Sequence, residues 1–569
     1  MDLPGLPPYR GDPVLVVGNG PVGQTTALLL ARWGIPSVLV DGRDRRDAVG
    51  SKAICQQRDV LDIWDSVGAG RTIAEEGVTW NRARTMHGEH ELFCLDYVDP
   101  GASESDAQPS FPPWVNISQS RTEEVLDDCI AESDLVDVRW SHRVLALRDT
   151  GDGVAADVDT PAGAVELHAP YAVGCAGAHG DLVREALGAR FEGRSFEDRF
   201  LICDIRTDLP GWERERRFYF DPEWNPGRQV LIHPCPDSTY RIDWQVPAEF
   251  DLDAEEASGA LDTRIRRIVG DRDYEIVWKS VYRFSSRCVD RMRRGRILLA
   301  GDCAHLVAPF GARGLNAGVP DAENAAWKLA FVLRGWAGSE LLESYDTERR
   351  AAAAENLAVT TATMDFLVPQ TEEGWARRRR LLQQAVHDPS VHSRIDSGRL
   401  AEPYWYADSP LSTPDPTREP PCRPARGSVN PPAVGVLLPD LAWRGGRLRE
   451  VARRGLTVLV ADPANAAAVT AAVDGATPAP LAVHPMEEAA AKLGARPGEA
   501  WLVRPDAHVA AILPATDSPG LRAAVGRVLG THHEDDKGNM HDRLDRHSAH
   551  AEARSSDPAS AQNQEALAR

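Results

Sequence analysis

The chain has 569 residues, of which 43% are hydrophobic, and a formal net charge of −21. This length is too great for one core and predicts three or four units. The acidic excess argues against nucleic acid or an anionic membrane as the main partner.

The cysteines and the apolar runs indicate the kind of compartment. Nine cysteines, an odd number without a C-x-x-C pair, are typical of reduced thiols in a cytosol, and we expect no metal site. No apolar run reaches the roughly 18 residues that a membrane-spanning helix needs. The first residues lack the features of a signal peptide. We therefore expect a cytoplasmic protein with no membrane partner.

A dinucleotide-binding motif opens the chain. An apolar strand from residue 13 runs into Gly18-x-Gly20-x-x-Gly23, a helix follows over residues 24–33, and a second strand ends at Asp41. Such glycines allow a tight turn, close approach of the backbone to a pyrophosphate and close helix–strand packing, while the acid binds a ribose. The predicted cofactor-binding residues here are Gly18, Gly20, Pro21, Val22, Gly23, Asp41, Gly42 and Arg43. FAD and NAD fit this motif equally well. For Arg43, Arg45 and Arg46 as a group, a solvated loop is the favoured alternative to phosphate binding.

Three further segments carry candidate cofactor residues. Arg58 lies in an amphipathic stretch over residues 56–64, and Gln119 opens another over residues 119–126. Each alone is equally compatible with a polar residue on a helix surface. A strand-like run from residue 171 leads into a glycine-containing turn with Gly177 and Arg184.

Residues 191–290 differ in composition, because they are rich in aromatic and β-branched residues. They predict strands of a mainly antiparallel sheet. Alternation sends about half of such side chains to each face. The pocket candidates are Tyr219, Ile232, His233, Trp244 and Tyr282, although a structural role is the more common one for such residues. None of them can be assigned as a catalytic base.

A second glycine-rich segment follows the sheet region. The apolar run 297–300 ends at Gly301 and Asp302, a loop with Pro309, Gly311 and Gly314 comes next, and we expect a helix to open around residues 317–320. Its N-terminal amides would favour an acceptor that becomes anionic, such as a reduced flavin.

In their order and spacing, these segments resemble the FAD-dependent aromatic hydroxylases, the p-hydroxybenzoate hydroxylase family. The resemblance implies that Asp302, after Gly301, binds the ribityl hydroxyls, that Arg58 approaches the pyrophosphate, and that Gln119 contacts the ribityl side. Gly177 would also bind FAD. The residues that would line the flavin ring are Pro309, Gly311, Gly314, Leu315 and Asn316, with Pro309 also bordering the substrate.

The turn after residue 171 departs from the family pattern. Ala176 stands where the family carries an aspartate that is associated with FAD and NAD(P)H binding, and Gly180 stands where it usually has serine. The loss of that carboxylate puts the efficiency of flavin reduction in doubt.

The resemblance implies an α/β fold class. It comprises a dinucleotide-binding FAD domain with an inserted, mainly antiparallel substrate-binding sheet, and a C-terminal thioredoxin-like domain as in the phenol hydroxylase branch. That last domain has no C-x-x-C, which excludes a dithiol role. The expected boundaries are 1–190 and 291–408 for the FAD domain with a helical segment, 191–290 for the sheet, 409–432 for a linker, 433–530 for the thioredoxin-like domain and 531–569 for a disordered tail.

The implied activity is that of a flavoprotein monooxygenase. NADPH or NADH would reduce FAD, and O2 would then form a C4a-hydroperoxide that hydroxylates a small aromatic substrate, either a phenol or a polycyclic polyketide. The alternatives are an epoxidase or Baeyer–Villiger oxygenase on the same scaffold, or a flavin-binding protein with impaired turnover. The chain could form a homodimer.

Overall fold

The structure is a computed structural model that describes Leu3, Gly50 and residues 5–48, 52–97, 111–418 and 432–531. Its contacts divide the chain into two units. The first unit comprises residues 1–333 and 345–403, and the second comprises residues 334–344 and 404–569.

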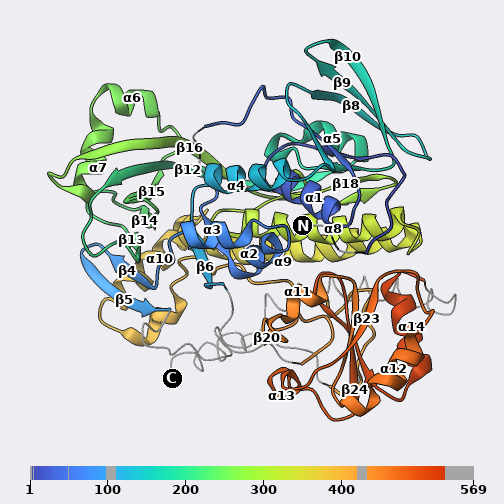
Figure 1. Ribbon diagram of the computed structural model, residues 1–569. Helices are drawn as coiled ribbons and strands as arrows, with labels where there is room; N and C mark the ends of the chain where they lie inside the picture. The colour runs from blue at the N-terminus through green and yellow to red at the C-terminus, as the bar shows by residue number, and fades with distance from the viewer. Residues whose placement is uncertain are drawn as a thin grey trace. The chain divides into compact units, whose positions relative to one another are not determined.

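A six-stranded sheet forms the centre of the first unit (Figure 1). Its order is β17-β18-β11-β1-β2-β7, and all of its neighbouring pairs are parallel except the edge pair β17–β18. The strands β1, β11 and β18 are buried throughout, as expected for a parallel sheet covered on both faces. The bounds are β1 Val14–Val17, β2 Ser37–Val40, β7 Val136–Arg139, β11 Ala172–Gly174, β17 Arg293–Arg294 and β18 Ile297–Leu299.

Helices and small sheets surround this centre. Helix α1 packs against both α4 and α8, and a three-stranded arm of β8, β9 and β10 is visible in Figure 1. The short pair β3–β6 stands apart from the large sheets. The bounds are α1 Pro21–Arg32, β3 Cys55–Gln57, α2 Arg58–Asp65, α3 Gly70–Glu76, β6 Trp114–Asn116, α4 Gln119–Ala131, β8 Arg143–Asp149, β9 Val154–Thr160, β10 Gly163–Ala169, α5 Asp181–Leu187, α8 Arg313–Leu333, α9 Glu343–Leu367 and α10 Glu372–Ala385.

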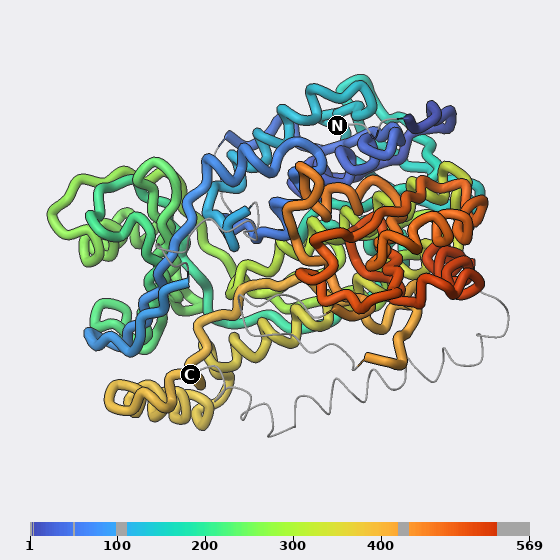
Figure 2. The backbone as a smooth tube through the Cα atoms, turned by 60° about the horizontal axis from the view of Figure 1, so that its bottom comes forward, coloured from blue at the N-terminus to red at the C-terminus, as the bar shows by residue number. Residues whose placement is uncertain are grey.

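The second large sheet of this unit has eight strands in the order β19-β16-β12-β15-β14-β13-β4-β5. It confirms a mainly antiparallel sheet, but it extends beyond residues 191–290, because β4 and β5 come from the N-terminal part of the chain. Figure 2 shows this blue strand pair beside the green strands, and β4 pairs with β13 in parallel. The bounds are β4 Arg82–His87, β5 His90–Asp96, β12 Phe191–Thr207, β13 Glu215–Phe220, β14 Gln229–Cys235, β15 Thr239–Val246, β16 Tyr274–Val289 and β19 His305–Leu306.

The two faces of this sheet have different coverings. One face is closed by α7 (Ala260–Val269), whose Leu261 and Ile265 share a core with Ile242 and Trp244 of β15. The helix α6 (Leu252–Ala257) precedes α7. The other face carries Phe200, which shares a separate core with residues of α9 and α10. The sheet therefore has one structural face and one face that points toward the remainder of the first unit.

The second unit contains a four-stranded sheet of order β23-β22-β24-β25. Strands β22 and β23 are parallel, while β24 and β25 run antiparallel to their neighbours, and helices follow β22 and β25. This is the topology of a thioredoxin-like core, as the sequence predicted. The bounds are β20 Ala442–Trp443, β21 Gly446–Arg447, α11 Leu448–Ala452, β22 Leu456–Val460, α12 Ala466–Val473, β23 Leu481–Pro485, α13 Ala489–Leu493, β24 Glu499–Val503, β25 Val509–Pro514 and α14 Ser518–Val528.

The predicted linker does not begin as a free connection. Its first residues pack onto the second unit, since the Thr413 amide donates to Ala510 O at 2.8 Å and Arg418 forms an ion pair with Glu499 at 2.6 Å. Residues 419–431 and the predicted disordered tail beyond Thr531 lie outside the described residues. Across the described residues, none of the helices has the length and apolarity needed to cross a membrane.

One predicted helix start is wrong. Helix α8 begins at Arg313, before the predicted range 317–320, and Pro320 lies inside the helix. A proline suits the first turn of a helix, where its missing N–H has no role, and Pro320 instead lies beyond the first turn. The first amides of α8 are those of residues 313–316, directly after the Gly311 loop.

Candidate active site

The glycine loop between β1 and α1 has the geometry of a phosphate cradle. Gly18 has a φ of +108°, and a Cβ there would lie 2.5 Å from Cys175 O. A Cβ on Gly23 would lie 1.9 Å from Gly18 O, so α1 packs directly on the turn. At Gly20, by contrast, a Cβ would meet nothing within 4 Å. Two glycines thus close the turn, and the third leaves open space for a ligand.

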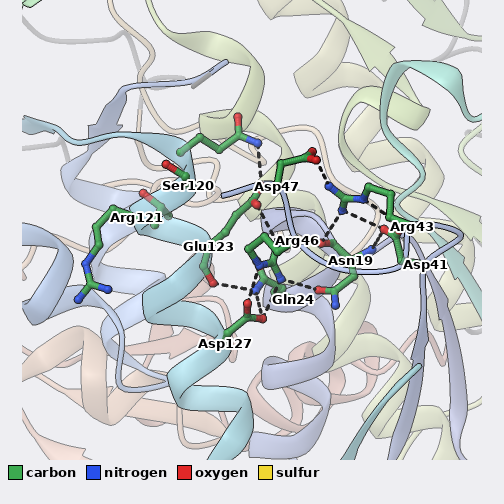
Figure 3. A network of polar contacts seen from close by, with 12 residues as sticks. Asn19, Gln24, Asp41, Arg43, Arg46, Asp47, Ser120, Arg121, Glu123 and Asp127 are labelled. Atoms are coloured by element: carbon green, nitrogen blue, oxygen red, sulfur yellow. Dashed lines mark hydrogen bonds and ion pairs between the residues drawn. The ribbon is translucent and has the colours of Figure 1, made fainter. Parts of the chain in front are cut away.

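The acid at the end of β2 belongs to a network of polar contacts (Figure 3). Asp41 accepts hydrogen bonds from the Asn19 amide at 2.9 Å and from Arg43 Nε at 3.0 Å. Burial opposes ionisation of Asp41, but the bonds from Arg43 and Asn19 outweigh it and hold the pKa of this carboxyl below its usual value. Arg43 therefore covers the carboxylate that would bind a ribose.

The solvated-loop interpretation is wrong for Arg46. Its side chain is only 11% exposed and bonds to Glu123 at 2.7 Å and to Asp127 Oδ1 at 2.7 Å, both on α4. It also donates to the carbonyl and side-chain oxygens of Asn19 (Figure 3). Arg46 thus fastens the glycine loop to α4, because two carboxylates balance its buried charge.

The third glycine segment lies against the first. Ala176 adjoins Gly18, since a Cβ on Gly18 would lie 3.0 Å from Ala176 Cα. A Cβ on Gly180 would lie 2.4 Å from Cys303 Sγ, so serine would not fit at this position beside Cys303. The departure at Gly180 is therefore matched by the bulk of Cys303. Arg184 donates to Cys303 O at 3.2 Å and so joins this segment to the one after β18.

The Gly301–Asp302 turn at the end of β18 is held by hydrogen bonds to Asp321 of α8. Asp321 accepts from the Gly301 amide at 2.9 Å, bonds to His305 Nε2 at 2.7 Å and pairs with Arg349 at 2.6 Å. Asp321 is fully buried, whereas the Asp302 side chain is exposed. The turn is rigidly anchored on its inner side, and Asp302 stays available to a ligand.

The loop before α8 is fixed by close packing at Gly311 and by hydrogen bonds from Asn316. Gly311 has a φ of +87°, and a Cβ on it would lie 2.0 Å from Arg399 O. The Asn316 side chain accepts from the Gln57 amide at 2.9 Å and donates to Cys55 O at 2.8 Å. Asn316 thus ties this loop to β3. Pro309 is exposed, and Gly314 and Leu315 are half-buried, so they border open space at the start of α8.

Two other predicted cofactor residues engage protein partners. Arg58 Nε donates to Phe111 O at 2.8 Å. Gln119 accepts from the Ala53 amide at 3.1 Å and donates to Glu123 at 2.8 Å. Both residues hold segments next to the glycine loop, and their contacts with a cofactor remain a prediction. Gly177 has a φ of +67° and open space at its Cβ position.

The residues present fit a bound dinucleotide. The open positions at Gly20 and Gly177, the closed turn at Gly18 and the carboxylate of Asp41 meet at the carboxyl ends of parallel strands, where such sheets bind ligands. The exposed Asp302 stands at the end of the next strand in that sheet.

The five pocket candidates of the sheet divide between its two faces. Ile232 and Trp244 are buried in the core with α7, and Tyr219 packs against that core. His233 and Tyr282 lie on the other face, where Tyr282 packs against the core that contains Phe310 of the loop before α8. A single pocket cannot hold all five, and only His233 and Tyr282 lie on the face that carries Phe200.

Sequence reasoning missed the charged neighbours of His233. Arg241 pairs with His233 across β14 and β15, and Asp204 pairs with Arg241 across β12 and β15. Arg241 binds Asp204 in a bidentate ion pair at 2.7 and 2.8 Å, and it donates to Lys52 O at 3.3 Å. Alternation within β15 could have placed Arg241 and Asp243 on one face, but only the register brings them to His233.

Comparison with known proteins agrees with this geometry. Residues 12–360 match a family model described as FAD binding domain. The chain belongs to this family. The match spans the glycine loop, the sheet and the segment that follows β18, which are the parts that form the candidate site.

Named relatives match just under two thirds of the chain. The 3-(3-hydroxy-phenyl)propionate/3-hydroxycinnamic acid hydroxylase of Mycolicibacterium smegmatis is 28% identical over 380 residues, which cover 66% of this chain and 65% of the relative. The para-nitrophenol 4-monooxygenase of a Pseudomonas strain is 29% identical over 362 residues, covering 62% of this chain and 86% of that protein. The chain thus aligns with slightly less than two thirds of the hydroxylase's length.

The solved structures show the same fold. The flavin-dependent monooxygenase PieE, solved in complex with FAD and substrate, has a TM-score of 0.79 at 23% identity and covers 92% of this chain and 100% of its own. This likeness confirms the predicted fold class, including the inserted sheet and the C-terminal α/β unit.

Proposed function

We propose that the protein is an FAD-dependent monooxygenase that uses NADPH or NADH and O2 to hydroxylate an aromatic substrate, either a phenol or a polycyclic polyketide. The observation that carries the proposal is that one face of the eight-stranded sheet packs against Phe310, in the loop between Asp302 and α8. A pocket on that face would place a substrate beside a flavin. The relatives named as hydroxylases and monooxygenases support the reaction class.

The chain's own residues would perform the binding. The glycine cradle at Gly20 would receive the pyrophosphate, Asp41 would exchange Arg43 for the ribose hydroxyls, and Asp302 would bind the ribityl chain. Bound FAD would supply electron transfer from the nicotinamide and activation of O2. The amides at the start of α8 would stabilise negative charge on the reduced ring. A cytosolic location is part of this proposal, and the eight described cysteines are all free thiols.

The test is the visible spectrum of the purified protein before and after anaerobic addition of NADPH, with and without a panel of phenols. Yellow, oxidised flavin that is bleached faster in the presence of one phenol is the expected result. A colourless protein that takes up no added FAD would overturn the proposal.

A second candidate, a flavin-binding protein with impaired turnover, is favoured only by Ala176. This residue lies against Gly18, where the family's aspartate would stand beside the cofactor loop. If this candidate holds, NADPH does not bleach the bound flavin with any phenol, and Ala176→Asp raises NADPH oxidation strongly. If the wild type is reduced readily, and Ala176→Asp changes little, the second candidate is wrong.

A further inference from the structure

Asp243 occupies an unusual position on the face of the sheet that points toward Phe310. Its direct neighbours across the strands are Ile202 on β12 and Leu231 on β14, and both belong to the apolar core that includes Phe310. Directly beyond lies the polar row of Asp204, Arg241 and His233. Asp243 thus stands at the boundary between an apolar surface and a charged one.

The carboxylate of Asp243 is not satisfied by the part of the chain that the structure describes. Among those residues, none forms a hydrogen bond with its buried Oδ1. Its Oδ2 lies 3.8 Å from His233 Nε2, which is too long for a hydrogen bond. Arg241 is already engaged by Asp204 through two bonds of 2.7 and 2.8 Å. A buried polar atom left in this state calls for an explanation, and function is one of the common ones.

Asp243 and His233 are both partly accessible to solvent. Their side chains are 19% and 15% exposed, on the sheet face whose core includes Phe310. Further contacts connect this face with the Asp302 turn and with the loop before α8. Arg241 bonds to the carbonyl of Lys52, whose charge acts on Asp302, and Phe310 packs edge-on against Phe200 at 5.6 Å between ring centres.

We propose that Asp243 accepts the proton of the substrate's phenolic hydroxyl, an inference that rests on the proposed function. The O–H bond of the phenol breaks, and its electron pair stays on the oxygen, from which the negative charge is delocalised into the ring. The proton forms an O–H bond with the free carboxylate oxygen. The ring becomes more electron-rich, which is what an aromatic carbon needs to take up an oxygen atom.

The surroundings of Asp243 give it the basicity for this step. Burial raises the pKa of Asp243 to about 7, against the opposing charges of Arg241 and Arg216 and with the help of Asp204. On β14, burial together with Arg216 and Arg241 keeps the pKa of His233 well below its usual value, and burial raises the pKa of Cys235 to about 12, so both are neutral near pH 7. Because His233 is neutral, it does not compete as a cation for the Asp243 carboxylate. A base with a pKa near the working pH is the most effective.

The test uses the full-length holoenzyme with 4-nitrophenol and 3-(3-hydroxyphenyl)propionate as probes. The variant is Asp243→Asn, which removes the base and keeps the size. The matched control is Asp237→Asn in the exposed turn between β14 and β15, where φ is +56° and asparagine is well tolerated. Product formation from 3-(3-hydroxyphenyl)propionate and NADPH consumption are measured between pH 5.5 and pH 9, because the hydroxyl of 4-nitrophenol ionises by itself within this range.

In the wild type and in Asp237→Asn, product formation is expected to rise as the pH increases through about 7, where Asp243 ionises. Asp243→Asn is expected to lower it by roughly 100-fold and to abolish this rise. NADPH consumption and FAD content should persist, with the lost product appearing as hydrogen peroxide. Asp243→Glu, which keeps a carboxylate, should recover part of the rate and of the pH dependence.

A second measurement does not depend on turnover. The absorbance of bound 4-nitrophenol reports its ionisation, and this ionisation should respond to pH differently in the wild type and in Asp243→Asn. An unchanged titration, or wild-type product formation with an unchanged pH profile in the variant, overturns the inference alone. A wild type that binds no FAD, or consumes no NADPH or NADH with any phenol, overturns the proposed function instead.

Discussion

Two glycines of the loop after β1 are needed for different reasons, although they lie only a few positions apart. Gly23 is required by packing, because any side chain there would strike the carbonyl of Gly18. Nothing in the described residues requires Gly20, since none of their atoms lies near its Cβ position and its φ of −98° suits any residue. The fold needs this loop but does not need a glycine at position 20, which indicates that the glycine makes room for a ligand.

Gly20→Thr is therefore expected to separate binding from folding. Threonine caps a helix about as well as glycine, so the free energy of unfolding of the ligand-free protein should change by less than about 0.5 kcal/mol. The side chain would fill the cradle, and we expect FAD affinity to fall at least about tenfold, measured by flavin fluorescence titration. The contrasting variant Gly23→Val should lower stability by about 1–3 kcal/mol or more, since the core is overpacked. Unchanged FAD affinity in Gly20→Thr would contradict the cradle.

A second residue-scale prediction concerns the stability cost of Asp243. A carboxyl whose folded pKa is about 7, compared with an ordinary value of 3.8, binds its proton more tightly in the folded state. Its ionisation therefore destabilises the fold increasingly as the pH rises from about 4 to about 7. Asp243→Asn removes this penalty, and we expect it to stabilise the protein by up to about 4 kcal/mol at pH 8, and by less at pH 5.

Urea unfolding of the wild type and of Asp243→Asn at both values of pH measures this difference. If the variant were less stable than the wild type at pH 8, Asp243 would have a structural role, such as a counter-ion for Arg241. That result would also weaken its assignment as a proton acceptor.

Among the elements, α8 does more than cover the six-stranded sheet. Through Asp321 it holds the Gly301 amide, His305 and, from α9, Arg349. Burial disfavours the charge of Asp321, but Arg349 and His305 outweigh burial and lower the pKa of this carboxyl. The contribution of Asp321 to stability is therefore present above its ordinary pKa of 3.8 and is lost as the pH falls below that value. One buried side chain thus orients the turn that presents Asp302.

Asp321→Ala is expected to lower the free energy of unfolding by about 3–5 kcal/mol, because it removes one partner of a buried ion pair with Arg349. Adding Arg349→Met should restore part of this loss, since replacing both partners of a buried pair costs far less than removing one. Denaturant unfolding of the two single variants and the double variant measures their coupling. If the double variant lost the sum of the two single effects, the pair would not act as a unit.

At the level of the whole molecule, the chain does not divide where its composition changes. Residues 334–344 run from the end of α8 into the first two residues of α9, yet they belong to the second unit. Within that unit Leu341 and Leu342 are completely buried, and a Cβ on Gly530 would lie 2.9 Å from the Leu341 amide. The second unit therefore joins its thioredoxin-like part to a segment that comes much earlier in the chain.

A chain ended after Pro403 tests this arrangement. It retains all the candidate cofactor residues, and we expect it to bind FAD, but Leu341 and Leu342 would lose their cover. The truncated protein should aggregate, as measured by size-exclusion chromatography with detection at the flavin absorbance. Changing both leucines to serine in the truncated chain should reduce this aggregation. A monodisperse truncated protein without these changes would contradict the prediction.

Local sequence determined the parts of this protein that depend on neighbours along the chain. The turn at Gly18, the strand ending at Asp41, the turn at Gly301 and Asp302 and the alternation of β14 and β15 follow from backbone conformation and from periodicity, which a short window of sequence contains. The segments that resemble the hydroxylase family are likewise recognisable from short stretches of sequence.

Only the tertiary structure decided what depends on register and on distant segments. It buried Arg46 between two carboxylates of α4, moved the start of α8 to Arg313 and placed Ile232 and Trp244 against α7. It also added β4 and β5 to the sheet and left Asp243 with an unpaired oxygen. The physical reason is common to all of these. A charge or a side chain is stabilised by the residues that pack against it, and these come from distant parts of the chain. Alternation along a strand predicts that the sheet has two faces, but it does not show which face packs toward the cofactor-binding part.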